Sequence, residues 1–491
     1  MNFNSYSYLI FLPTVVIGYY LLPKKIRWVL LLLASYFFYA CWDVRFAGLM
    51  LLSTTVEYTA TRMMGRARKR ITDPVKLKRA LRGWLLFSLC GNLGLMLPFK
   101  YYGFVAGTLQ GIFDAMEVAL RLPDFSILLP VGISFFTFQA IGYTVDVYRG
   151  EMEPVKNFAR YALFISFFPQ LVAGPIERAI NLQPQLKKTY DFSLDNMREG
   201  LAMILLGLCR KVLIADRLAV LVDAVYKYPD TFGGFSLVLA TFFFGFQIYC
   251  DFCGYSDIAV GSAKLLGVQL MTNFTQPYYS LSITEFWRRW HLSLSTWFRD
   301  YVYFPMGGNR RGPARTAFNM MVVFLISGLW HGADWTFVVW GGVHGVYQLV
   351  GRWTLPLRQK LRAALRIREE GWLRKSAAWL FTMALVTLAW VFFRAQSLTE
   401  AFEIFAALPR GWTLKEFQFL LSRVDYRDLL LGAGGILLLF LWDGFNLKRP
   451  LMPKILEKPS WFRWGLALTV IFVLILFGQY GELTPFIYFQ F

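Results

Sequence analysis

Apolar runs and short basic segments alternate along the whole chain. Most of the runs are long enough to approach or cross the hydrocarbon core of a bilayer, which is about 30 Å thick. This pattern predicts an all-α, polytopic integral membrane protein. The candidate spans cover residues 6–22, 28–41, 46–61, 83–99, 126–147, 160–176, 196–224, 232–252, 316–350, 376–393, 428–442 and 464–480.

The composition supports this class of protein. Hydrophobic residues make up 56% of the 491 residues, aromatic residues make up 18%, and the mean hydropathy is +0.45. Lys24, Lys25 and Arg27 follow the first apolar run instead of preceding it, so we expect this run to stay in the protein and not to act as a cleavable signal. No long polar or glycine-rich linker divides the chain, and we expect a single membrane domain over residues 1–491.

The basic residues fall in blocks between the apolar runs. Residues 62–82 hold nine Lys or Arg and one Asp, residues 352–375 hold eight against two Glu, and residues 448–463 hold five. Such blocks are typical of cytoplasmic loops, so topology explains the net charge of +20 better than nucleic-acid binding does. We therefore expect the lipid bilayer and no nucleic acid as a partner, and we predict that both termini are extracytoplasmic.

Cysteine chemistry has little support. Cys250 and Cys253 form a C-x-x-C motif, but the chain has no second such pair, and its histidines are distant in sequence. Helix packing explains these thiols better than zinc or a disulfide does, and the sequence predicts no metal site.

Two of the three histidines lie in residues 327–345, SGLWHGADWTFVVWGGVHG. The preceding run, residues 316–330, makes only about 22 Å of helix, which is shorter than the hydrocarbon core. Both flanks are basic, so the chain is predicted to enter the membrane, turn near His331 and return. Backbone that turns at this depth needs protein or water around it, so we expect His331 to line a cavity, with Trp330 as a wall and Asp334 as a possible partner. For His344, a structural role is the favoured interpretation.

The third histidine, His291, lies in residues 280–308, where charged residues alternate with tryptophans. This mixture fits a polar cavity wall in which Arg288 and Trp290 face an anionic or carbonyl-bearing ligand. A helix lying on the membrane surface is the alternative. Further polar and aromatic lining is expected from the preceding apolar run, through Asp251, Tyr255 and Asp257.

Four stretches resemble the signature sequences of membrane-bound O-acyltransferases: EFWRRWHLSLSTWFRDYVYFPMGGNR, SGLWHGADWTFVVWGGVHG, FFPQLVAGPIER and QIYCDFCGYSDIAVG. Their order and spacing are similar to those of the bacterial alginate O-acetylation subfamily, and the resemblance covers nearly the whole chain. At Cys253 the family pattern leads us to expect serine, so a hydroxyl has no role at that position here.

The resemblance implies a ring of about 10–12 transmembrane helices, with re-entrant helices, around a central tunnel. It implies that His331 is essential and that His291 is the second polar site residue. The implied reaction moves an acetyl group from a cytoplasmic thioester, acetyl-CoA or another acyl thioester, towards an exported polysaccharide, most simply alginate. The implied setting is the bacterial inner membrane, with periplasmic or membrane-anchored acetylation partners and no tightly bound cofactor.

The residues are suited to this chemistry independently of the family resemblance. A neutral imidazole can take the proton of a hydroxyl as its oxygen attacks a thioester carbonyl. Arg288, Trp290 and backbone amides near Gly332 are candidate donors to the oxyanion. The chain has no G-x-S-x-G motif, so direct transfer, or transfer through a partner's hydroxyl, is favoured over a serine nucleophile in this chain.

Two kinds of alternative stay open at this point. The acceptor could be another cell-envelope polymer: cellulose, peptidoglycan or, with D-alanine as the acyl group, teichoic acid. In a different class, the chain could be a polysaccharide or acyl transporter, or a scaffold for a secretion complex. A transporter is expected to show paired broken helices in matching halves, which the sequence does not indicate.

Overall fold

The computed structural model describes residues 1–123, 125, 128–366, 368, 370–479 and 486–489. These residues form helices and loops, and this described part holds no strand, which confirms the predicted all-α class. Within the same part, five helices are long and apolar enough to cross a bilayer by length and composition, and two shorter apolar helices precede them. The long ones are α4 (Pro74–Ala115), α11 (Gly234–Leu265), α17 (Trp372–Arg394), α20 (Tyr426–Lys448) and α22 (Ser460–Phe477).

The chain divides into two compact units. Unit 1 comprises residues 1–204 and 258–271, and unit 2 comprises residues 205–257 and 272–491. Helix α11 contributes to both units, as does α9 (Leu194–Leu208). The expectation of a single domain stays a prediction. The other helices of unit 1 are α1 (Tyr6–Leu21), α2 (Arg27–Ala40), α3 (Val44–Arg70), α5 (Ile133–Arg149), α6 (Phe158–Ser166), α7 (Phe168–Leu171) and α8 (Ala179–Lys187), besides α4.

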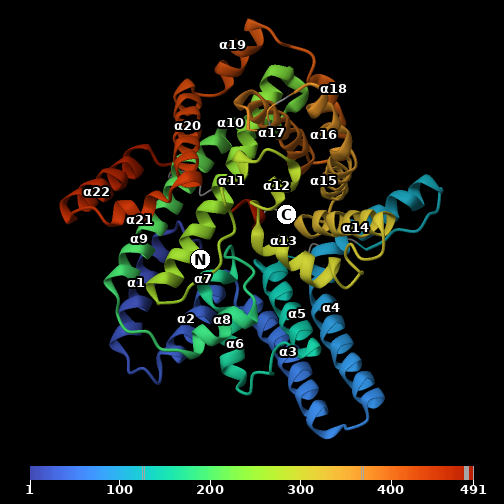
Figure 1. Ribbon diagram of the computed structural model, residues 1–491, viewed down its shortest axis with the longest axis vertical. Helices are drawn as coiled ribbons and strands as arrows, with labels where there is room; N and C mark the ends of the chain where they lie inside the picture. The colour runs from blue at the N-terminus through green and yellow to red at the C-terminus, as the bar shows by residue number, and fades with distance from the viewer. Residues whose placement is uncertain (124, 126–127, 367, 369, 480–485, 490–491) are drawn as a thin grey trace. The chain divides into compact units, whose positions relative to one another are not determined.

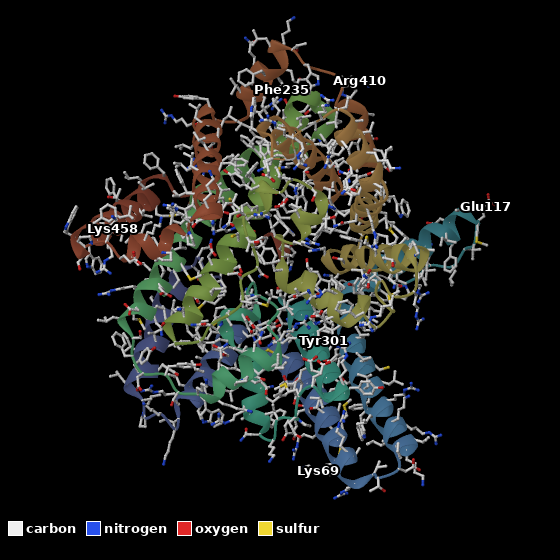
Figure 2. The ribbon with its side chains drawn as sticks, viewed as in Figure 1. Lys69, Glu117, Phe235, Tyr301, Arg410 and Lys458 are labelled. Atoms are coloured by element: carbon white, nitrogen blue, oxygen red, sulfur yellow. The ribbon has the colours of Figure 1, made fainter. Side chains whose placement is uncertain are left out.

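In unit 1, α3 and α4 form an antiparallel hairpin (Figure 1). The second helix starts sharply because Asp73 accepts a hydrogen bond from the Val75 amide at 2.8 Å and Pro74 occupies the first helical position. The basic block of residues 62–82 covers the end of α3, the connection and the start of α4, and Figure 2 shows Lys69 at the tip of the hairpin.

Unit 2 contains all three histidines. Its remaining elements are mostly short helices that join the long apolar ones. They are η1 (Cys209–Ala215), α10 (Asp216–Tyr226), η2 (Pro229–Thr231), η3 (Pro277–Tyr279), α12 (Ile283–Trp287), α13 (Leu292–Phe298), η4 (Arg299–Tyr303), α14 (Pro313–His331), α15 (Trp335–Trp353), α16 (Leu355–Ala364), α18 (Leu398–Ala407), α19 (Leu414–Arg423), α21 (Leu451–Leu456) and η5 (Ile487–Phe489).

The predicted spans overlap helices, with three refinements. The run at 126–147 becomes helical only at Ile133, where α5 begins. The run at 196–224 contains a π-helical turn, η1, between α9 and α10. The run at 160–176 is interrupted at Phe167, whose ψ of 107° lies outside the helical range, and α7 begins at the next residue with Pro169 in its first turn. The predicted break near His331 is confirmed, since α14 ends at that residue and α15 begins four residues later. The edges of two predicted spans, residues 126–127 and 480, lie outside the described residues.

Glycines bring α14 and α15 into very close contact. A Cβ atom on Gly328 would lie 2.2 Å from the carbonyl oxygen of Phe337, and one on Gly341 would lie 2.2 Å from the carbonyl oxygen of Phe324. Any larger residue at either position would force the two helices apart. The close contact therefore holds His331, the last residue of α14, at a fixed place relative to α15.

Candidate functional site

His331 ends α14 at a sharp change of backbone direction. The next residue, Gly332, is extended, and Asp334 then caps α15 by accepting a hydrogen bond from the Thr336 amide at 2.8 Å. This carboxylate, which the sequence suggested as a partner for the imidazole, thus has a capping role that the sequence analysis did not assign. A Cβ on Gly332 would lie 2.1 Å from the ring of Phe337, so the turn requires glycine.

Aromatic side chains enclose the His331 ring, which is only 2% exposed. Its centroid lies 5.0 Å from that of Trp330, 5.1 Å from Trp340 on α15, 5.6 Å from Phe393 on α17 and 5.5 Å from Tyr488 on η5. Walls of this kind exclude bulk water and lipid, and a low-dielectric site strengthens electrostatic interactions with a reacting group.

His291 lies beside His331, with 6.4 Å between the two ring centroids. It is fully buried, and its φ of 44° is uncommon for a residue with a side chain. This backbone is held in place by Asn273, which accepts hydrogen bonds from the Leu292 amide at 2.9 Å and from the Ser293 hydroxyl at 2.6 Å. Backbone strain held by surrounding contacts is frequent at functional sites.

Both ring nitrogens of His291 are buried, and no hydrogen-bond partner for either lies within the described part of the chain. Burial lowers the pKa of the His291 imidazole to about 3, so the ring is neutral at pH 7. A buried polar group without a partner in a native structure calls for an explanation, such as a ligand or a water that it binds.

His344 differs from the other two histidines. Its Nδ1 accepts a hydrogen bond from the indole of Trp287 at 3.2 Å, and its ring lies 5.0 Å from that of Trp340. The hydrogen bond joins α15 to α12 and supports the structural role that we favoured for His344.

A buried cation anchors the C-terminal residues next to the histidines. Lys211 contacts the carboxylates of Asp216 at 2.8 Å and Asp251 at 2.6 Å. Asp251 also accepts a hydrogen bond from the backbone amide of Ile487 at 2.7 Å. Because Ile487 precedes Tyr488, this ion pair fixes the aromatic ring that contacts both His331 and His291.

Tyr255 and Asp257 take part in the same region. The ring of Tyr255 stacks on that of Phe486 with 4.6 Å between centroids. Asp257 forms an ion pair with Arg210, which also contacts Asp443 at 3.4 Å. These predicted lining residues thus hold the C-terminal segment and neighbouring helices, and their contact with a substrate stays a prediction.

The structure therefore separates the predicted site residues into groups. His331, His291 and Trp330 lie together, with 6.1 Å between the Trp330 and His291 ring centroids. Trp290 is buried among aromatic rings, 5.1 Å from Phe274. Arg288 follows α12 and is exposed, outside this buried group. Roles for Arg288 and Trp290 as oxyanion donors stay predictions.

Sequence reasoning missed Lys211, Phe486 and Tyr488. A signal for Lys211 was present, because Arg210 and Lys211 interrupt an apolar run in which charges need partners, and Asp251 and Asp257 lie at the end of another such run. For the two C-terminal aromatic residues, no local pattern gives their location beside the histidines.

Together these features indicate a multi-pass integral membrane protein whose candidate site contains two neighbouring buried histidines. The profile of MBOAT, the membrane-bound O-acyltransferase family, matches residues 153–393, which include all three histidines. The chain belongs to this family and is an acyltransferase.

Its relatives share most of their length with this chain. It is 39% identical over 420 residues to the probable alginate O-acetylase AlgI of Azotobacter vinelandii, covering 85% of this chain and 80% of the relative. It is 35% identical over 507 residues to the probable alginate O-acetylase AlgI of Pseudomonas putida, with both chains covered in full. It is also 35% identical over 427 residues to the peptidoglycan O-acetyltransferase of Helicobacter pylori, covering 80% of this chain and 77% of the relative.

Proposed function

We propose that this acyltransferase passes an acetyl group from a cytoplasmic thioester, acetyl-CoA or another acyl thioester, towards hydroxyl groups of an exported polysaccharide, and that alginate is the acceptor. The observation that carries the proposal is the convergence of two buried histidines, His331 and His291, within 6.4 Å in a chain of this family. The names of the alginate-related relatives, one of them covered over its whole length, support the choice of acceptor.

In the proposed mechanism, His331 is the general base. Its neutral imidazole takes the proton of the acceptor hydroxyl while the oxygen attacks the thioester carbonyl. A new C–O ester bond forms, the C–S bond breaks, and the proton passes to the departing thiolate. His291 orients the acyl group, because its buried ring can offer a hydrogen bond to a carbonyl oxygen in a site without bulk water.

We further infer that the protein lies in the bacterial inner membrane with both termini extracytoplasmic. The basic blocks support this orientation, because such blocks are typical of cytoplasmic loops. In this orientation the thioester donor, which is made in the cytoplasm, reaches the protein from the side of the basic loops. Membrane-impermeant thiol labelling of single cysteines tests it: a site at Asn4 should react in intact cells, whereas sites in residues 66–78 should not. Periplasmic or membrane-anchored partner proteins would complete transfer to the polymer.

The acceptor is tested on the polymers themselves. Cells with and without the intact gene are compared for base-labile acetate on purified exopolysaccharide and on purified peptidoglycan. Acetate that depends on the gene in the exopolysaccharide supports the proposal. Gene-dependent acetate in the peptidoglycan alone would favour the activity named for the Helicobacter pylori relative.

The catalytic role is tested with two matched substitutions on one hairpin. Asparagine at position 331 keeps a polar group of similar size but cannot take a proton at pH 7, so His331→Asn should lower acetylation about 10²–10⁴-fold. His344→Asn is the control, since asparagine can still accept the hydrogen bond from Trp287. Acetylation that persists at the wild-type level in His331→Asn, with both variants expressed equally, would refute the assignment.

A further inference from the structure

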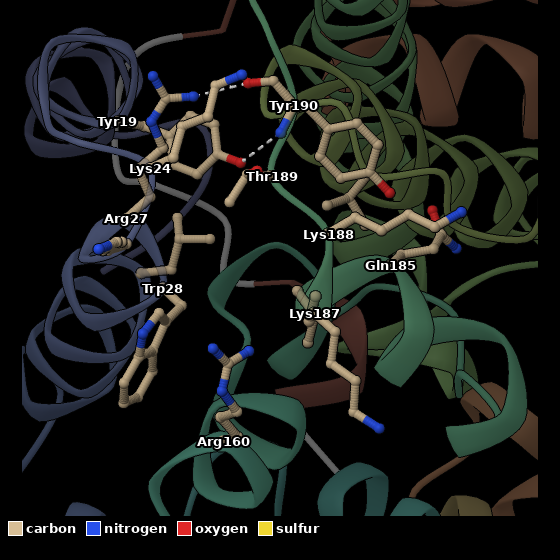
Figure 3. Close-up of a pocket in the computed structure, with 14 residues that line it drawn as sticks. Tyr19, Lys24, Arg27, Trp28, Arg160, Gln185, Lys187, Lys188, Thr189 and Tyr190 are labelled. Atoms are coloured by element: carbon tan, nitrogen blue, oxygen red, sulfur yellow. Dashed lines mark hydrogen bonds between the residues drawn. The ribbon is translucent and has the colours of Figure 1, made fainter.

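A basic pocket lies in unit 1, well away in sequence from the histidines (Figure 3). Its volume is about 230 Å³, and it is formed by the end of α1, the start of α2 and their connection, the start of α6, the end of α8 and the segment that follows it. Fourteen residues line it, and none of them is acidic. Six carry a positive charge: Lys24, Lys25, Arg27, Arg160, Lys187 and Lys188.

One of these cations is part of the frame of the pocket. The guanidinium of Arg27 donates hydrogen bonds to the carbonyl oxygens of Tyr190 at 2.7 Å and Leu22 at 3.0 Å, and it lies 5.1 Å from the ring centroid of Tyr19. The Tyr19 hydroxyl in turn accepts a hydrogen bond from the Tyr190 amide at 3.5 Å, as Figure 3 shows. These contacts fix the segment after α8 against α1.

Lys24 is neutralised by an ion pair with Asp191 at 2.7 Å. The four remaining cations form no ion pair in the part of the chain that the structure describes. Lys25, Lys187 and Lys188 are exposed and form no ion pair there. Arg160 is half-buried, and its guanidinium lies 4.9 Å from the ring centroid of Trp28. The pocket thus concentrates positive charge that the protein itself does not neutralise, which is the electrostatic signature of a site for an anion.

We propose that this pocket binds the phosphate headgroup of an anionic membrane lipid. Basic pockets between helices on the cytoplasmic side of membrane proteins suit such headgroups. The remaining walls are apolar or aromatic, with Trp28, Leu31 and Leu186 among them, so the site offers contacts to a glycerol backbone and the start of an acyl chain. Aromatic residues beside basic ones are also typical of the membrane interface, where headgroups lie.

The size of the pocket favours a headgroup over a nucleotide. Sites that enclose drug-sized ligands have volumes of roughly 300–1,000 Å³, which is more than this pocket offers. A free phosphate ion shares the same chemistry with the lipid headgroup, but it would leave the apolar walls without a contact. The proposal concerns binding alone and does not depend on the proposed acetyl transfer.

The test compares two variants with the same change of charge. In the pocket variant, Lys25, Arg160, Lys187 and Lys188 are replaced by glutamine. The control variant carries the same replacement at four exposed basic residues at the end of α3 and the start of α4: Lys69, Arg70, Lys76 and Lys78. Each protein is reconstituted in vesicles of phosphatidylcholine and phosphatidylglycerol and extracted in mild detergent. The phosphatidylglycerol that stays bound to it is then counted by native mass spectrometry.

We expect the wild type and the control variant to retain phosphatidylglycerol in preference to phosphatidylcholine. The pocket variant should lose this preference, because each basic residue near a lipid surface strengthens binding about fivefold. Equal loss in both variants would refute the site, since it would reflect general surface charge. If inorganic phosphate displaces the lipid from the wild type as readily as added phosphatidylglycerol does, the site binds free phosphate and the lipid proposal is wrong.

If the pocket variant with its four substitutions fails to fold, single substitutions still test the proposal. The single changes Lys187→Gln and Lys188→Gln alter exposed side chains that form no ion pair in the described part of the protein. Each should lower phosphatidylglycerol retention severalfold while the elution volume of the protein stays unchanged. Full retention in both single variants would contradict the proposal.

Discussion

Replacing Gly328 by alanine tests whether the tight hairpin positions the base. The added methyl group would lie 2.2 Å from the carbonyl oxygen of Phe337, where ordinary contact begins at about 3.4 Å. The helices α14 and α15 must therefore separate by roughly 1 Å at this point. Because His331 lies less than one turn further along α14, it must move relative to Trp340 and the other rings that enclose it.

The expected effect on activity exceeds the effect on stability. Overpacking costs about 1–3 kcal/mol, and the better helix propensity of alanine offsets up to about 1 kcal/mol of this cost. A displacement of about 1 Å in a catalytic group, in contrast, lowers the rate about 10²-fold, which corresponds to about 2.7 kcal/mol in the activation barrier. The thermal midpoint should thus fall modestly while acetyl transfer nearly disappears.

The assay measures acetyl transfer and thermal unfolding on the same purified samples. Gly342→Ala is the matched control, because a Cβ at this neighbouring position would meet only the Leu325 Cδ2 atom, at 3.5 Å. The control should keep both activity and stability. Wild-type turnover in Gly328→Ala would show that the spacing of α14 and α15 does not govern the reaction, and the positioning argument would be wrong.

Two further predictions concern the C-terminal anchor. Lys211→Met should lower the free energy of unfolding by about 3–5 kcal/mol, because it leaves the Asp216 and Asp251 carboxylates buried without a cation. An unchanged unfolding midpoint in detergent would contradict this view of the ion pair. Tyr488→Phe keeps the ring contacts with His331 but removes the hydroxyl, so it should lower acetyl transfer without lowering stability if that hydroxyl takes part in the reaction. Normal turnover would limit Tyr488 to a wall of the site.

The positions of the helices could be predicted because the bilayer imposes a simple rule. Apolar runs of sufficient length must become helices that satisfy their own backbone, and basic blocks must stay outside the hydrocarbon core. The same rule located the break at His331, since the run at 316–330 is too short to cross. The ring of helices and the tunnel that the family resemblance implies stay predictions.

The side-chain arrangement of the site could not be predicted in the same way. Arg288, Trp290 and His291 are near neighbours in sequence, yet one is exposed, one lies in an aromatic cluster and one contacts His331. Helix α12 ends at Trp287, and the left-handed backbone at His291 breaks the regular periodicity that would relate these side chains to one face. The pattern of apolar and polar residues does not indicate such a change of backbone direction.

Contacts between residues far apart in sequence could not be predicted either. Those that the structure shows also explain the role of the buried charges Lys211 and Asp251. Asp251 and Ile487 are 236 residues apart, and only the folded chain brings them together. Once Lys211 and Asp251 are explained as an anchor, they no longer compete with the histidines as candidates for chemistry. His291 is one of the buried polar groups near the base that still lack a partner within the described residues, and both of its ring nitrogens are unsatisfied there. Since an unpaired buried imidazole costs free energy, a substrate that supplies its hydrogen bond is bound more tightly at this place, next to the residue proposed to remove the proton.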